Sequence, residues 1–139
     1  MNAALFNNTL ETAARLLIAL PIINHPANLD EIAAADLAAT YMRFFGYGER
    51  NLHGDSEFAL AEFQSHRIRV DAGLRKLVRA GYVISNQEAS VFTAAATATE
   101  QQALIRSEFA DAYRAAVTTL VTRGLLNDVV YRATQAVTQ

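Results

Sequence analysis

The change of hydrophobic period at Gly81 constrains the fold of this chain more than any other sequence feature. Before Gly81, apolar residues recur at helical spacing and predict a helix from roughly Phe63 to Ala80. After it, Tyr82-Val83-Ile84 and Ser90-Val91-Phe92-Thr93 flank a polar turn, which is the pattern of a β-hairpin. Because no other segment carries a convincing strand pattern, the sequence predicts a mainly helical fold with one hairpin.

Capping signals place the helices before this point. Asn8 followed by Glu11 resembles a capping box and predicts a helix through about Leu20, which Pro21 should end or kink. Asn28 with Glu31 predicts a second helix over residues 29–45, stopped by nearby glycines. The segment that follows, residues 47–57, reads as a loop.

Three more capping signals follow the hairpin. Thr97 with Glu100 predicts a short helix to about residue 105, and Ser107 is expected to cap a helix over residues 108–123. Asn127 or Asp128 is expected to cap a last helix that begins at Val129 and frays toward the end of the chain.

The order of these elements predicts a winged helix-turn-helix-like domain with a β-hairpin wing and a C-terminal helical extension. No linker or repeat divides the sequence, so residues 1–139 are expected to form a single domain. Helical stripes assign the following residues to the core: Phe6, Leu10, Leu17, Leu74 and Leu77.

Composition excludes several classes of function. The chain has no Cys, which excludes disulfides, thiol catalysis and Cys-based zinc sites. A net charge of -2 argues against binding nucleic acid by bulk charge alone. No stretch is long enough to cross a bilayer and no signal peptide is recognisable, so we expect a cytoplasmic protein without a membrane partner.

The residues that could carry chemistry are sparse. The chain has no glycine loop of a nucleotide site, so any ATP dependence is expected to come from a partner. His53, with His25 and His66, matches no metal-ligand spacing, and Ser56 lies too close along the chain to His53 and Asp55 for a catalytic triad. We therefore expect no catalytic residue, no cofactor and no metal, and treat His53 as a loop interface candidate.

The helix predicted before Gly81 carries a basic face. Its residues opposite the apolar stripe are Arg69, Arg75, Lys76 and Arg79, whereas Arg67 falls toward the apolar side and is a weaker member. This is the recognition-helix position of a winged helix, so the face could contact phosphates, although a merely solvated charged face is the more ordinary interpretation for a chain with net negative charge. Ile68, also on the polar face, suggests a protein partner more than bare DNA.

A set of short motifs adds a family resemblance. They are Phe6-Asn7-Asn8-Thr9-Leu10-Glu11 with Arg15 and Leu17, Pro26 before Leu29-Asp30, Leu52-His53, Glu62, Arg67, Gly73-Leu74, Gly81 and Ser107. In combination they resemble the middle component of ABC-three-component systems, over residues 6–123.

The resemblance implies a non-catalytic accessory subunit of a bacterial anti-phage or anti-plasmid system of the Lamassu kind. Such a subunit would work with an SMC-like ABC ATPase and with an effector, often a nuclease, and could meet double-stranded DNA through the complex. An independent, dimeric winged-helix DNA-binding regulator is the alternative. The two differ in whether the chain binds duplex DNA alone.

Overall fold

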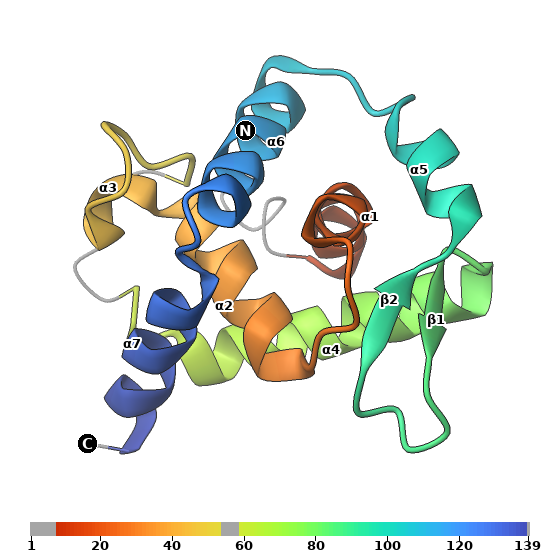
Figure 1. Cartoon of the computed structure of the whole chain (residues 1–139), viewed down its shortest axis with the longest axis horizontal. Coiled ribbons are helices and arrows are strands. Elements are labelled where there is room, and N and C mark those ends of the chain that lie inside the picture. The colour runs from red at the N-terminus through yellow and green to blue at the C-terminus, as the bar shows by residue number, and fades with distance from the viewer. Residues whose placement is uncertain (1–7, 54–58, 139) are drawn as a thin grey trace.

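A computed structural model of the chain describes residues 8–53 and 59–138, so Phe6, Asp55 and Ser56 lie outside the described residues. Figure 1 shows the mainly helical architecture that the sequence predicts. In chain order the elements are α1 (Thr9–Ile23), α2 (Leu29–Thr40), α3 (Met42–Phe45), α4 (Phe63–Ala80), β1 (Val83–Ser85), β2 (Phe92–Ala94), α5 (Ala96–Gln102), α6 (Glu108–Thr122) and α7 (Leu126–Thr138).

Helix α1 is the central element, in contact with α2, α4, α5, α6 and β2 (Figure 1). Asn8 caps it as predicted, with its side chain accepting from the Glu11 N–H at 2.8 Å. The prediction that the helix ends near Leu20 was wrong, because α1 continues through Pro21 to Ile23. Pro21 lies in the last turn, where its missing N–H removes little of the hydrogen-bond ladder before left-handed Asn24 closes the helix.

The capping box of Asn28 and Glu31 is confirmed, with both reciprocal hydrogen bonds present. The predicted helix over residues 29–45 is instead interrupted at Tyr41, whose φ of -130° and ψ of 46° are not helical. The interruption divides the segment into α2 and the short α3.

Helix α4 has the bounds that the sequence predicts, and Gly81 ends it with a left-handed φ of 85°. The helix packs most extensively on α1, and Gly73 lies at the closest approach. A Cβ on Gly73 would lie 3.3 Å from both the Ala13 nitrogen and a Leu16 methyl group, so a side chain here requires its neighbours on α1 to shift by a few tenths of an ångström.

The hairpin after α4 is confirmed, with β1 and β2 antiparallel and Ile84 opposite Thr93. Ala27, in the connection between α1 and α2, pairs with the other side of β2. Its N–H donates to the Phe92 carbonyl at 2.9 Å, and the Phe92 N–H donates back at 2.8 Å.

The predicted caps of the C-terminal half were right only in part. Ser107 caps α6, its hydroxyl accepting from the Ala110 N–H at 2.9 Å. Thr97 does not cap α5, because its hydroxyl donates to the Gly81 carbonyl at 2.9 Å and anchors the helix to the end of α4. Neither Asn127 nor Asp128 precedes α7, because this helix already begins at Leu126, shortly after α6 ends and just beyond left-handed Gly124.

Helix α7 packs on α2, with Val129 and Ala133 fully buried. Arg132 fixes it to the end of α3. The Arg132 guanidinium carbon lies 4.7 Å from the centre of the Phe45 ring, and Nη1 donates to the Phe45 carbonyl at 2.8 Å. Tyr47 adds a hydrogen bond from its hydroxyl to Asp128.

The predicted core was largely right. Leu17, Leu74 and Leu77 are buried, whereas Leu10 is 67% exposed, and its assignment to the core was wrong. Leu10 lies in the first turn of α1, where the helix borders an open groove rather than a covering element.

These burial values give a paired prediction on stability. Leu74→Ala should lower the free energy of unfolding by about 2 to 5 kcal/mol, because it opens a cavity in a fully buried site. Leu10→Ala, at an exposed position of the same residue type, should cost less than about 1 kcal/mol. Urea denaturation of both variants measures the difference, and equal costs would contradict the assigned helix faces.

Candidate functional site

The most constrained polar group in the described structure is the carboxylate of Asp36, at the middle of the Ala-rich helix α2. Its side chain is completely buried. Oδ1 accepts hydrogen bonds from Arg15 Nε at 2.9 Å and from the Tyr113 hydroxyl at 2.7 Å. These contacts connect α2 to α1 and to α6.

The second oxygen of Asp36 completes the cluster. Oδ2 accepts from Arg15 Nη2 at 3.1 Å and lies 2.8 Å from His66 Nε2, which comes from α4. Arg15 and His66 are each 3% exposed, and the Thr12 hydroxyl lies 3.4 Å from Arg15 Nη2. One carboxylate therefore holds together α1, α2, α4 and α6.

The electrostatics of this cluster keep Asp36 and Arg15 ionised. Burial opposes ionisation of Asp36, but the Arg15 charge and the hydrogen bond from His66 outweigh it and hold the pKa of Asp36 far below its usual value. The pKa of Arg15 is raised, because attraction to Asp36 exceeds the effect of its own burial. Burial and the Asp36 charge raise the pKa of Tyr113. A carboxylate that is buried and accepts bonds on both oxygens is suited to holding helices together rather than to proton transfer.

Sequence reasoning named Arg15 as part of a motif and did not foresee its partners. The signal was present in the helical stripes. Asp36 follows Ala33-Ala34-Ala35 in a helix without a polar face, and His66 falls between Phe63 and Val70 on the apolar stripe of α4. Ionisable groups on apolar faces are expected to meet, because each would otherwise be buried unpaired.

His53, the predicted loop interface candidate, lies beside this cluster. Its ring stacks on Phe109 with centroids 5.7 Å apart and meets Tyr41 edge-on at 5.8 Å. Burial and the neighbouring Arg15 charge lower the pKa of His53 to about 4, so the ring is neutral near pH 7. Part of the ring stays exposed, and an interface role stays a prediction.

The predicted basic face of α4 divides into two groups. Arg67 and Arg69 are partly buried, and Arg67 Nε lies 2.7 Å from Asp30. Arg75, Lys76 and Arg79 are exposed. Arg75 forms an ion pair with Asp71 at 2.8 Å, and Ile68 is 72% exposed. The structure therefore brings Arg75, Arg79 and Ile68 together on one exposed stripe and turns the earlier arginines toward the protein.

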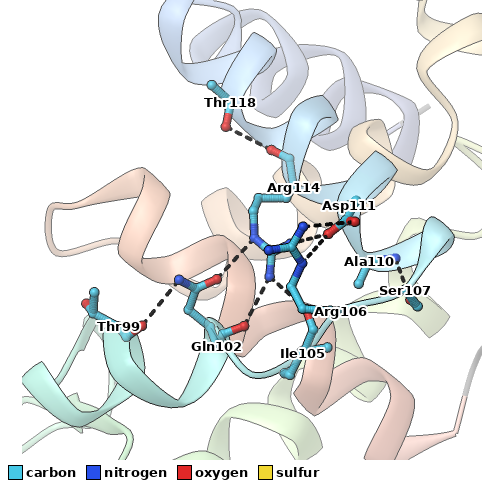
Figure 2. A network of polar contacts seen from close by, with 9 residues as sticks. All are labelled: Thr99, Gln102, Ile105, Arg106, Ser107, Ala110, Asp111, Arg114 and Thr118. Atoms are coloured by element: carbon cyan, nitrogen blue, oxygen red, sulfur yellow. Dashed lines mark hydrogen bonds and ion pairs between the residues drawn. The ribbon is translucent and has the colours of Figure 1, made fainter.

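A second polar cluster joins α5 to α6 (Figure 2). Its residues line an open hollow of about 640 Å³. Arg114 donates to the Gln102 side chain at 3.1 Å, to the Gln102 and Ile105 carbonyls at 3.0 Å, and to Asp111 at 2.8 Å. Arg106 also donates to Asp111, at 3.0 Å. These bonds satisfy carbonyls at and just after the end of α5. The cluster therefore holds the connection between α5 and α6 in place.

Two features are absent from the described residues. No group of three or more His, Asp or Glu side chains within residues 8–53 and 59–138 is arranged to hold a metal ion. Over the same part of the chain, no helix has both the length and the apolar character needed to cross a membrane.

Comparison with known proteins decides the family. The family model of the ABC-three component (ABC-3C) system Middle Component 2 matches residues 5–128. The chain belongs to the Middle Component 2 family. No curated protein and no solved structure matched the chain.

The family match confirms the middle-component resemblance, and the structure gives roles to several of the motif residues. Arg15 binds the buried Asp36, Gly73 permits the contact of α4 with α1, and Ser107 caps α6. This Middle Component 2 protein is thus an accessory component of an ABC-three-component system whose motif residues mainly secure its fold.

The Asp36 cluster predicts strong non-additivity. Asp36→Asn should lower the free energy of unfolding by about 3 to 5 kcal/mol, because it leaves the Arg15 charge buried without its partner. Arg15→Met should be similarly costly, and the double variant Arg15→Met/Asp36→Asn should cost at least about 1 kcal/mol less than the sum of the two single costs. Denaturation of all three measures this coupling. Asp71→Asn, in the more exposed pair with Arg75, is the control and should cost less than about 1 kcal/mol.

The lowered pKa of His53 predicts a pH dependence of stability. The unfolded chain protonates His53 near pH 6.5 and the folded chain near 4, so stability falls as the pH drops through this interval, by about 2 kcal/mol after allowing for partial exposure. The contribution of Asp36 begins to fall only below its unfolded pKa, near 4. His53→Phe keeps the stacked ring and should flatten the profile between pH 6.5 and 4.

The matched control for this measurement is His25→Phe, at an exposed position. It should retain the wild-type slope of unfolding free energy against pH. An unchanged slope in His53→Phe would show that this ring is not the group that makes folding sensitive to acid.

Proposed function

We propose that this middle component is a non-catalytic bridging subunit that links an SMC-like ABC ATPase to an effector such as a nuclease, in an anti-phage or anti-plasmid system of the Lamassu type. The observation that carries the proposal is the family match over residues 5–128, which places the chain in a multi-component ABC system. The buried Asp36 cluster supports it, since the most strongly organised ionisable groups of the described chain serve packing.

A winged-helix-like architecture is part of the proposal. Helices α1, α2 and α4 precede the hairpin, and Ala27 pairs with Phe92 as a third, single-residue strand between the first two helices. This strand position and the following hairpin are the arrangement expected of a wing. The long connection through α3 departs from a short helix-turn-helix turn, so the support rests on the hairpin rather than on the turn.

In this arrangement α4 takes the recognition-helix position, and its exposed stripe is the proposed contact surface. Arg75 and Arg79 lie four residues apart on one face, with Lys76 beside them and Ile68 at the same face seven residues before Arg75. We assign this stripe to the phosphates of duplex DNA held by the assembled complex. The stripe excludes Arg67, which forms an ion pair with Asp30, and Arg69, which is partly buried.

Reconstitution tests both parts of the proposal. The wild-type chain should co-purify with the ATPase of its system, and the assembly should bind a random-sequence 30-base-pair duplex. Arg75→Ala/Arg79→Ala should weaken that binding and reduce the slope of log K against log salt by about 2, because each lost phosphate contact removes about one released counterion. Salt-titrated fluorescence anisotropy measures the slope.

The matched control is Arg50→Ala/Arg123→Ala, which removes the same charge at exposed positions away from α4. It should keep the wild-type slope. Release of the ATPase by the α4 variant, with DNA binding unchanged, would make the stripe a protein-docking surface. Tight, salt-sensitive DNA binding by the isolated chain would favour an independent regulator instead.

A further inference from the structure

An open groove of about 230 Å³ runs between α1, the end of α4 and α5. Its walls include Leu10, Ala14, Leu77, Ala80 and Ile105. Leu10 lines the groove and is 67% exposed, so a large apolar side chain faces solvent at this surface. The apolar wall residues of the groove belong neither to the buried cluster nor to the proposed DNA stripe, whereas Lys76 borders both the groove and the stripe.

The groove extends beyond this volume along α1. Ala14 and Ile105 also line a smaller hollow of about 100 Å³, whose other wall residues include Glu11. The two hollows therefore adjoin at Ala14 and Ile105. Small alanine side chains on α1 and α4 leave room for a bulky apolar residue to enter between the helices.

Charge selects among possible occupants. Of the described residues that line the larger groove, Lys76 alone is charged, and exposed Arg75 and Arg79 lie on the same helix. An occupant with an acidic side chain beside Lys76 would complement these positive charges. The walls are helices, whose backbone groups are bonded internally, so the groove offers side-chain packing rather than strand pairing.

We propose that this groove binds an amphipathic helix of another component of the system, with its apolar face against Leu10 and Leu77 and a carboxylate beside Lys76. The inference rests on the proposed bridging function and names the surface through which one bridge contact is made. Apolar residues three or four positions apart on the bound helix would enter between α1 and α4.

The sole lysine of the chain makes a direct test possible. A zero-length carbodiimide reagent joins an amine to a carboxylate, and Lys76 provides the only side-chain amine in the sequence. With the purified ATPase and effector present, peptide mapping should find Lys76 joined to an Asp or Glu of one of them, within a helical amphipathic segment. Lys76→Arg keeps the charge and should abolish the cross-link while retaining co-purification.

Affinity provides the second measurement. Leu10→Asp should weaken binding to the cross-linked component by at least about tenfold, because it puts a charge where the apolar face docks. Leu104→Asp is the matched control: Leu104 is 75% exposed and does not line the groove, so binding should stay at the wild-type level. Circular dichroism of both variants should show the wild-type fold, since both positions are exposed.

Other outcomes overturn the proposal in distinguishable ways. Equal binding by Leu10→Asp and wild type, with the complex intact, rejects the groove and leaves the bridging function standing. Failure of the wild-type chain to bind either component rejects both. A Lys76 cross-link to a second copy would make the groove a self-association surface. Residues 1–7 of the chain itself cannot produce the cross-link, because they contain no Asp or Glu.

Discussion

The carboxylate of Asp36 is the interaction on which the packing of this chain depends. The carboxylate is buried within α2 and accepts hydrogen bonds from Arg15 on α1 and Tyr113 on α6. It also lies within ion-pair distance of His66 on α4. A buried charge of this kind adds little net stability over a well-packed apolar group, but it is costly when any partner is misplaced. The cluster thereby penalises alternative rotations of Ala-rich helices, whose small apolar faces would otherwise discriminate poorly between packings.

Local signals predicted the fold where the backbone itself carries them. The bounds of α4, the capping box at Asn28 and the hairpin follow from side-chain spacing and from hydrogen bonds within a few residues. Predictions failed where tertiary contacts compete with local preference. Thr97 had a capping pattern but donates to Gly81 on another element, and the break at Tyr41 has no proline or glycine at that position to announce it.

The polar clusters were harder to predict than the helices. Periodicity identified the basic residues of α4 and marked Arg67 as the weaker member, but it could not separate partly buried Arg69 from Arg75 and Arg79, which are exposed. The contacts of Asp36 join residues far apart in sequence, and helical spacing gives only the face on which each one lies. The sequence does show that Arg15 and Asp36 carry opposite charges on two mostly apolar helices. This indicates that each charge needs a buried partner, but it does not identify which residue that partner is.

Helix α7 has a practical consequence for dividing this chain into fragments. The family match ends at residue 128, within the first turns of α7, yet Val129 and Ala133 are fully buried and Arg132 covers Phe45. An expression fragment that ends at residue 128 would lack most of α7. The apolar surfaces of α2 and of the end of α3 that α7 buries would then be exposed to solvent. Such a fragment would aggregate for reasons unrelated to its partners, so boundaries for biochemical work belong after α7.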